Sequence, residues 1–240
     1  MNLNESVALV TGANRGLGTR LVQELLRAGA AKVYATSRTP GAVAGDVTAD
    51  PRVQALTLDI TDPASVERAA GVAQDVTVLV NNAGVLAFGS ALDGDLEGFE
   101  RDLRTNYLGT LRVTRAFVPA LERNAPAAVV NVLTLIALAP VPPMAGYSAS
   151  KAAAHSITQA LRAELRGRGI TVLGAYPGGI DTDMLAGVEA DKAAPELVAG
   201  RIIAALAAEE TMVFPDDASA GAGAVYRQDP LKLEHLLLES

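Results

Sequence analysis

The chain has 240 residues; half are hydrophobic and 4% aromatic, with no Trp and no Cys. This length suits one large α/β domain or two small ones, and the apolar content is enough to bury a substantial core. A formal net charge of −7 disfavours nucleic acid as a partner, because an acidic protein repels phosphate backbones. The lack of cysteine excludes disulfides, thiolate nucleophiles and cysteine metal sites, and it is compatible with the cytoplasmic location that we expect.

The N-terminal stretch has no basic region followed by a long apolar segment, so we expect no signal peptide. No apolar run approaches the roughly 20 residues that span a bilayer, and we expect no membrane partner. The apolar stretch 127–140 is short, and it predicts a buried strand and its exit.

Short apolar runs alternate with amphipathic stretches along the chain. Strands are predicted at residues 7–10, 32–36, 53–58, 76–80, 128–133, 170–175 and 212–214. Helices are predicted at residues 17–28, 63–73, 96–121 (as two stretches), 145–166 and 195–209. This order predicts an α/β fold with a doubly wound, mostly parallel Rossmann-type sheet in a single domain, 1–240. A ligand is expected at the carboxyl ends of the strands.

A glycine-rich turn follows the first predicted strand, with the sequence Thr11-Gly12-Ala13-Asn14-Arg15-Gly16-Leu17-Gly18. Glycines let the backbone turn sharply and approach a pyrophosphate, and the helix that follows offers free N–H groups at its N-terminus. The alternative is an ordinary glycine-rich turn. The position between the first strand and an amphipathic helix favours phosphate binding.

The spacing TGxxxGxG resembles that of the short-chain dehydrogenase/reductase family, in its compact single-domain branch. The resemblance extends to about residue 214, through LDI at 58–60, NNAG at 81–84, the Asn of TNYLG, YSASK at 147–151 and PGGIDT at 177–182. It implies a nicotinamide cofactor, a small carbonyl or alcohol substrate, and a homodimer or homotetramer.

The resemblance also implies which residues contact the cofactor. They are Gly12, Asn14, Arg15, Gly16, Leu17, Gly18, Ser37, Arg38, Asp59, Ile60, Asn82, Ala83, Gly84, Tyr147, Lys151, Pro177, Gly178, Ile180 and Thr182. Asp59 resembles the family acid that contacts the adenine; the alternative is a residue at a helix N-terminus.

The end of the second predicted strand decides between the two nicotinamide cofactors. An Asp or Glu there would bind the ribose 2′-OH and select NAD. Here Ser37 occupies the position, Arg38 follows it, and Arg15 should lie on the same side. Two guanidinium groups make charge-assisted contacts with a 2′-phosphate, so the sequence favours NADP(H). The alternative is that both arginines are solvated surface residues.

Tyr147 and Lys151 are four residues apart on one predicted helix, and so project from the same face. An ammonium nearby favours the phenolate and should lower the pKa of the tyrosine, which could then act as acid or base on a carbonyl or alcohol. The alternative is a routine amphipathic pair. The position after the fifth strand, at the carboxyl rim, favours catalysis.

Two further residues resemble the family's catalytic set. Thr134 lies thirteen residues before Tyr147, where the family usually has Ser; its hydroxyl would bind the substrate oxygen, although its methyl group crowds the pocket. The alternative is a purely structural bond. Asn106 resembles the family asparagine that supports a water-linked proton relay from the lysine. The alternative is a polar residue that caps or kinks a helix.

Substrate choice should come from the loop at about 183–192, whose Met184, Leu185 and Val188 suggest an apolar pocket together with residues 141–144. The tail 215–240 is atypical, with a predicted loop at 215–223 and a Leu-rich segment at 231–238. His155 and His235 lack neighbouring ligand types, so no metal is expected and His155 should be a packed helix residue.

Three functions are compatible with these residues. The first is an active NADP(H)-dependent reductase or dehydrogenase. The second is a catalytically weak, NADP-sensing binding protein of the same fold, an alternative that Thr134 leaves open. The third is an epimerase or dehydratase; such relatives are usually longer and carry TGxxGxxG, which this chain lacks.

Overall fold

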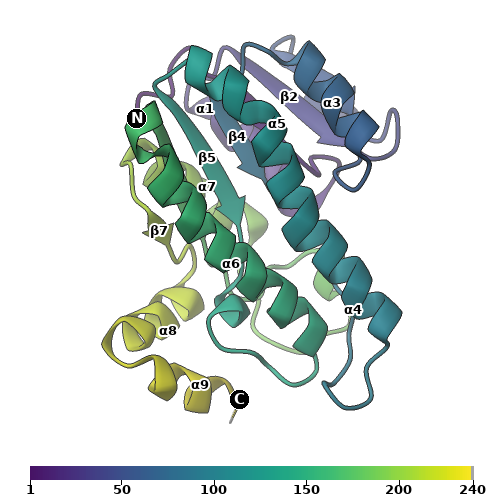
Figure 1. Ribbon diagram of the computed structural model, residues 1–240, viewed down its shortest axis with the longest axis vertical. Helices are drawn as coiled ribbons and strands as arrows, with labels where there is room; N and C mark the ends of the chain where they lie inside the picture. Colours follow the sequence, from purple (N-terminus) through teal and green to yellow (C-terminus); the bar gives the residue numbers. More distant parts are fainter. Residues whose placement is uncertain (239–240) are drawn as a thin grey trace.

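A parallel sheet forms the centre of the molecule (Figure 1). The computed structural model describes residues 1–238, and within them the sheet has seven strands: β1 (Val7–Val10), β2 (Lys32–Ser37), β3 (Val53–Thr57), β4 (Val78–Asn81), β5 (Ala127–Val132), β6 (Ile170–Ala175) and β7 (Met212–Val213). Their order is β3-β2-β1-β4-β5-β6-β7, and every neighbouring pair is parallel. The predicted doubly wound fold is confirmed, and the chain reverses its winding direction between β1 and β4, where such sheets bind ligands.

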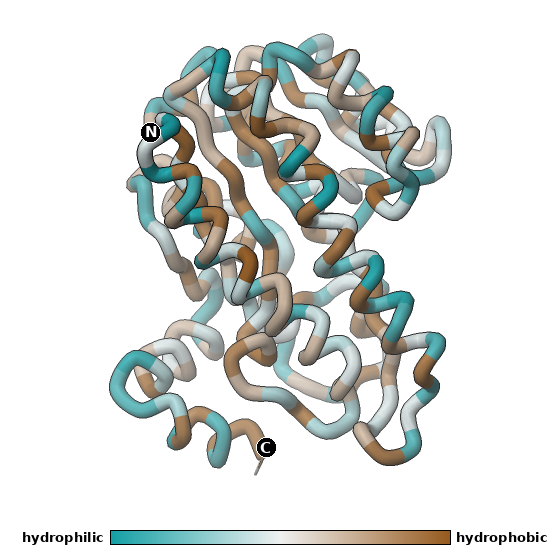
Figure 2. The backbone as a smooth tube through the Cα atoms, in the orientation of Figure 1, coloured by the Kyte–Doolittle hydropathy of each residue, from teal (hydrophilic) through white to brown (hydrophobic). Residues whose placement is uncertain are grey.

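Helices cover both faces of the sheet. On one face lie α1 (Gly16–Arg27) and α7 (Pro195–Ala207); on the other lie α3 (Pro63–Val72), α5 (Thr110–Arg123) and α6 (Ala145–Leu165). The central strands are therefore covered on both sides, and β4 and β5 are buried along their whole length, whereas the edge strand β3 is partly exposed. Figure 2 shows this pattern as brown strand segments at the centre of the fold.

Shorter helical segments occupy the connections. They are α2 (Gly45–Thr48), α4 (Leu96–Asp102), the π-helix η1 (Leu103–Gly109), and the 3-10 turns η2 (Leu135–Ala137), η3 (Arg166–Arg168) and η4 (Asp183–Leu185). The helical path α4–η1–α5 is continuous, where the sequence predicts two helices. The π-helix adds an extra residue to the turn, and such insertions are frequent at functional sites.

The C-terminal tail departs from the sequence-based prediction. Residues 215–223 were expected to form a loop, but α8 (Asp217–Gln228) begins there, followed by α9 (Pro230–Leu238). The prediction is wrong because the Gly, Ala and Ser content hides a capping box, in which Asp216 and Ser219 cap each other. Residues 239–240 of the predicted tail lie outside the described residues.

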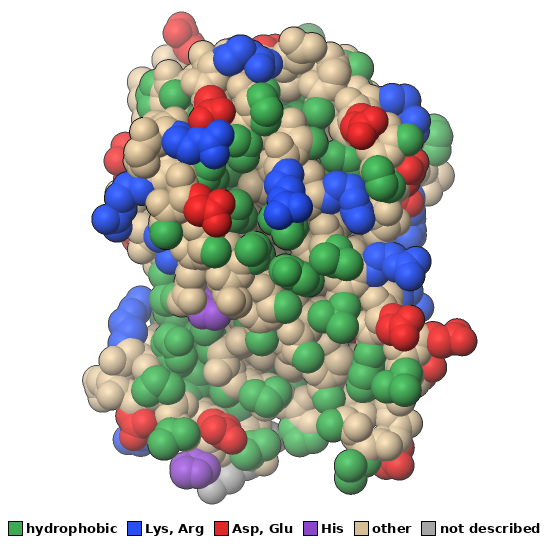
Figure 3. Space-filling model, in the orientation of Figure 1, with side chains coloured by type: hydrophobic (Ala, Val, Ile, Leu, Met, Phe, Trp, Pro, Cys, Tyr) green, Lys and Arg blue, Asp and Glu red, His purple; other side chains and the backbone are tan. Residues whose placement is uncertain are grey.

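A third apolar cluster attaches this tail to the rest of the fold. It joins Leu133, Tyr176 and Phe214 to Leu233 of α9. On the face shown in Figure 3, hydrophobic side chains gather over the lower half, which includes this tail, while Lys and Arg predominate above. Among residues 1–238, no helix combines the length and apolar character that a membrane span needs.

Candidate active site

The glycine-rich turn joins β1 to α1 and presents backbone to the carboxyl edge of the sheet. Gly12 and Gly16 have φ of +66° and +54°, a region that favours glycine. A Cβ on Gly18 would lie 2.1 Å from the Gly12 carbonyl oxygen. In the described part of the chain no side chain caps α1, so its first N–H groups have no side-chain acceptor there. This backbone cradle, formed by residues 11–18, fits a pyrophosphate.

The NNAG turn after β4 is bonded to this cradle. The side-chain amide of Asn82 donates to the carbonyl oxygens of Thr11 (2.9 Å) and Gly12 (3.1 Å). The Thr11 hydroxyl oxygen accepts the backbone N–H groups of Asn82 and Ala83, both at 2.9 Å. Two of the predicted cofactor segments are therefore held together as one surface.

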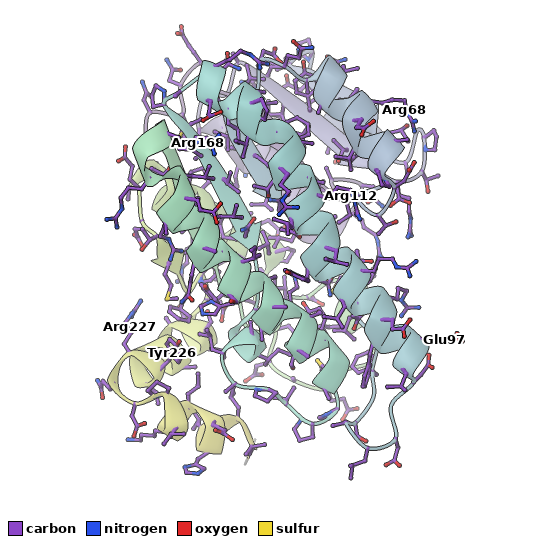
Figure 4. All side chains as sticks on the ribbon, viewed as in Figure 1. Arg68, Glu97, Arg112, Arg168, Tyr226 and Arg227 are labelled. Atoms are coloured by element: carbon purple, nitrogen blue, oxygen red, sulfur yellow. The ribbon has the colours of Figure 1, made fainter. Side chains whose placement is uncertain are left out.

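Ser37, Arg38 and Asp59 lie at the edge expected to receive the adenosine end of a nucleotide. Ser37 is buried at the end of β2, and its hydroxyl donates to the carbonyl of Thr39 at 2.6 Å, whereas Arg38 is exposed. Burial would raise the pKa of Asp59, but hydrogen bonds from Thr61 and the charges of Arg38 and Arg112 together lower it. Arg112, on α5 (Figure 4), also donates to the Ile60 carbonyl at 2.8 Å, which fixes this strand end.

Arg15 has a partner that the sequence did not predict. Its guanidinium donates to the Asp183 carboxylate at 2.7 Å, at the start of the loop expected to bind substrate. Both side chains are largely exposed. The same loop contacts the cradle, because a Cβ on Gly16 would lie 3.2 Å from the Thr182 methyl group.

Tyr147 and Lys151 are both buried on the first turns of α6, as a helical i, i+4 pair. The Lys151 ammonium donates to the Val132 carbonyl at the end of β5 (2.8 Å) and lies 5.8 Å from the centre of the Tyr147 ring. A Cβ on Gly84 would lie 3.1 Å from Asn106 Oδ1 and 3.7 Å from Lys151 Nζ. The structure therefore brings the predicted residues of three separate segments together.

Asn106 lies in the middle of η1 and is buried. Its Oδ1 accepts the Val85 N–H and its Nδ2 donates to the Val85 carbonyl, both at 2.9 Å. The same Nδ2 donates to the Ser150 hydroxyl (2.9 Å), which in turn donates to the Tyr147 carbonyl (2.7 Å). Asn106 thus joins the NNAG turn to the helix that carries Tyr147.

Thr134 lies just beyond β5 and is buried. Its hydroxyl donates to the Pro177 carbonyl at 3.3 Å, and the backbone N–H of Leu135 donates to the same oxygen at 2.8 Å. Beyond this loop, Ile180 forms an isolated bridge with Ala193 that closes the base of the substrate loop.

Comparison with known proteins places this arrangement in a family. A model described as short chain dehydrogenase matches residues 6–193. The chain belongs to the short-chain dehydrogenase family. The resemblance drawn from TGANRGLG, YSASK and the other motifs is confirmed.

Individual relatives cover most of the chain. It is 37% identical to 1-deoxy-11-beta-hydroxypentalenate dehydrogenase of Streptomyces exfoliatus, over 89% of this chain and 84% of that protein. It is 33% identical to carbonyl reductase [NADPH] 2 of Sus scrofa, over 82% and 80%. A short-chain dehydrogenase from Burkholderia cenocepacia J2315, solved in complex with NADP, superposes with a TM-score of 0.93 at 38% identity, covering 99% of each chain.

Burial shifts the pKa values of Tyr147 and Lys151, and for Tyr147 the shift is opposite to the one expected from the sequence. Burial lowers the pKa of Lys151 to about 8, against the raising effect of the Asp102 carboxylate. Burial, reinforced by Asp102, raises the pKa of Tyr147 above its ordinary value, whereas the sequence predicted a lowered one. The prediction is wrong for the protein alone because burial disfavours the charged phenolate, and the Asp102 carboxylate disfavours it further.

Asp102 was missed by the sequence analysis. It is fully buried at the end of α4, and its Oδ2 accepts the Ala87 N–H at 3.0 Å. Its Oδ1 is buried without a hydrogen-bond partner within residues 1–238. Burial raises the pKa of Asp102, against the N–H of Ala87 and the charges of Arg101 and Lys151. The sequence signal that could have identified Asp102 is its spacing, one helical turn before Asn106.

His155 occupies the helix beyond Lys151 as the packed residue that the sequence predicted. Its Nδ1 is hydrogen-bonded to the Tyr176 hydroxyl at 2.6 Å. Across the described range 1–238, no three His, Asp or Glu side chains are grouped closely enough to hold a metal ion.

Proposed function

We propose that the protein is an NADP(H)-dependent oxidoreductase that transfers a hydride between the nicotinamide and the carbonyl or alcohol carbon of a small or apolar substrate. The observation that carries this proposal is the convergence of Tyr147, Lys151 and Asn106 beside Gly84, next to the glycine-rich cradle. The relatives named as a carbonyl reductase and a hydroxypentalenate dehydrogenase support chemistry between carbonyl and alcohol.

Four features of the chain support NADP(H) as the cofactor. The uncapped N-terminus of α1 fits the pyrophosphate, and Ser37 stands where a carboxylate would repel a 2′-phosphate. Arg38 is exposed beside it. Arg15 is available to the same phosphate, because an exposed ion pair such as the one with Asp183 contributes at most about 1 kcal/mol. The Burkholderia relative solved with NADP agrees with this assignment.

When bound, the reduced cofactor supplies the hydride. The protein's own residues handle the proton: the Tyr147 hydroxyl donates it to the oxygen of the reduced carbonyl, or accepts it from an alcohol in the reverse direction. When substrate binds, the Thr134 hydroxyl turns its one proton from the Pro177 carbonyl to the same substrate oxygen. The Lys151 ammonium stabilises the phenolate, and Asn106 supports a water-linked path that returns a proton to Lys151.

Apolar side chains frame the expected substrate position. Met184, Leu185 and Val188 belong to the substrate loop, and Met144, at the end of the stretch 141–144, forms an isolated bridge with Gly89. Such surroundings suit a compact or hydrophobic carbonyl compound. Apolar pockets discriminate weakly, by about 1–3 kcal/mol per methylene, so we expect activity on several related substrates.

A screen of aldehydes, ketones, quinones and imines for NADPH consumption tests the proposal, with Tyr147→Phe as the matched variant. We expect turnover in the wild type and loss of turnover in the variant. Dissociation constants for NADPH and NADH, measured at one salt concentration, test the cofactor. Ser37→Asp should move the preference toward NADH. Equal affinities would contradict the cofactor assignment, and NADPH binding without turnover would favour the NADP-sensing binding protein.

A further inference from the structure

One peptide unit of the loop after β6 is held at both ends. Its carbonyl oxygen, on Pro177, accepts the Leu135 N–H (2.8 Å) and the Thr134 hydroxyl (3.3 Å). Its N–H, on Gly178, donates to Asp216 Oδ2 at 2.9 Å. Because a peptide is planar, a donor at one end and an acceptor at the other fix its rotation about the chain.

The Asp216 carboxylate is itself held rigidly. It is 3% exposed and precedes the first turn of α8, where the helix dipole favours a negative charge. Oδ1 accepts the Ser219 N–H (2.8 Å), and Oδ2 accepts the Ser219 hydroxyl (2.7 Å). The carboxylate that binds Gly178 is thus held on the helix by the backbone N–H of Ser219 as well as by its hydroxyl.

Packing locks the same helix against the loop. The ring of Phe214 lies 5.5 Å from that of Tyr176, the residue before Pro177. A Cβ on Gly223 of α8 would lie 2.5 Å from the Phe214 ring, so the helix packs directly on this side chain. The guanidinium of Arg227, also on α8 (Figure 4), lies 5.1 Å from the centre of the Phe214 ring.

We propose that Asp216 is a positioning residue of the active site: it fixes the Pro177–Gly178 peptide, which in turn positions Thr134, through the Leu135 N–H, and the loop beside the nicotinamide. This inference rests on the proposed function. A carboxylate on the N–H polarises the peptide and strengthens its carbonyl as an acceptor for the Leu135 N–H, which holds the backbone beside Thr134 and leaves the Thr134 proton free to turn to the substrate. A cap for α8 alone would need only the contacts with Ser219, and Asp216 makes a further one to Gly178.

Four variants separate positioning from capping. Asp216→Ala removes both roles, and Asp216→Asn keeps one acceptor oxygen for Gly178 or Ser219. Ser219→Ala removes the hydroxyl contacts of the cap but keeps the backbone N–H that holds Oδ1, so the Gly178 contact remains. Asp217→Asn is the matched control, because that side chain is 90% exposed and pairs with Arg201. Hydrogen exchange of peptides covering residues 176–180 is measured on the cofactor-free chain, together with kcat, KM and the dissociation constant of NADP⁺.

We expect faster exchange at residues 176–180 and a loss of about 10–100-fold in kcat/KM in Asp216→Ala, since a displacement of about 1 Å costs about 10²-fold. Asp216→Asn should be intermediate, and it replaces the alanine variant if that variant does not fold. Ser219→Ala should lower thermal stability while exchange at 176–180 and kcat/KM stay near the wild type. Unchanged exchange in both Asp216 variants, or equal losses in Asp216→Ala and Ser219→Ala, would overturn the inference.

The same measurements distinguish this inference from the proposed function. A wild type that neither binds nor oxidises NADPH would end the proposed function, while exchange at residues 176–180 would still decide whether Asp216 holds the loop. Normal NADPH turnover with no effect of either Asp216 variant would remove the positioning role alone.

Discussion

The glycine-rich turn and the Pro177–Gly178 loop lie at the same edge of the sheet, but they are built differently. The turn shapes its cradle from backbone within residues 11–18, with Asn82 as its side-chain support. The loop depends on Thr134 from one strand earlier and on Asp216, which follows it by 38 residues. A local motif can therefore specify the first site, whereas the second exists only after the whole sheet and α8 have assembled.

Tyr147→Phe should give the largest effect and separates catalysis from the cradle. It removes one oxygen and keeps the packing of the ring, so the variant should fold and bind NADPH. Turnover should fall about 10²–10⁴-fold if the phenol is the general acid. Steady-state kinetics at saturating NADPH measure the loss, with Tyr107→Phe on η1 as the control. Near-normal turnover would show that another group moves the proton.

Thr134→Val tests the site built around the Pro177–Gly178 loop. The substitution keeps the shape and removes the hydroxyl that donates to Pro177. If this hydroxyl also holds the substrate oxygen, kcat should fall by about 10²–10³, as for loss of one preorganised donor. NADPH affinity should change little, and Thr134→Ser should retain activity or raise it. A fully active valine variant would leave Thr134 with a structural role only.

Gly18→Ala tests the glycine-rich turn. Its Cβ would meet the Gly12 carbonyl oxygen at 2.1 Å and Asn82 Nδ2 at 2.7 Å, so backbone must move. We expect a loss of about 1–3 kcal/mol in the free energy of unfolding, the usual cost of overpacking. NADPH should also bind more weakly, because the moved atoms form the cradle. Gly200→Ala, where the new Cβ would have no neighbour within 4 Å, is the control; equal affinities in the two variants would contradict the expectation.

These two sites also show how far sequence alone reaches. The succession of strands and helices, the glycine turn and the pairing of Tyr147 with Lys151 follow from local patterns, because apolar periodicity and i, i+4 spacing are properties of short segments. The structure places Asn106 beside Gly84, near Lys151, and Thr134 against the Pro177 carbonyl. The roles of all four in catalysis remain predictions.

Other features could not be predicted, because they depend on contacts between distant segments. Helix α8 was predicted as a loop, since its small residues carry little helical signal and its stability comes from the Asp216 cap and from Phe214 against Gly223. The raised pKa of Tyr147 also escaped prediction. Spacing indicates that an ammonium is near, but only the packed structure shows how strongly burial opposes the phenolate.

Asp102→Asn should move the pH dependence of alcohol oxidation. After burial, the Asp102 charge is the second cause that raises the pKa of Tyr147, and it also raises the pKa of Lys151. Removing the charge should lower both, so the phenolate forms at lower pH and the rising limb of the rate profile shifts to lower pH. Asp95→Asn, an exposed cap of α4, is the matched control. A shift to higher pH would show that Asp102 acts on the site in another way.

Asp183→Asn should give the smallest effect, and it asks whether the cradle and the substrate loop compete for Arg15. The exposed ion pair contributes at most about 1 kcal/mol, so its loss should cost little stability. With Arg15 released, NADPH should bind up to about fivefold more tightly, the equivalent of that energy. NADH, which has no 2′-phosphate, should bind as before. The gain should fade at high salt, because exposed charges are screened. Asp181→Asn in the same loop is the control, and an equal change in NADPH and NADH affinity would show that Arg15 does not reach the 2′-phosphate.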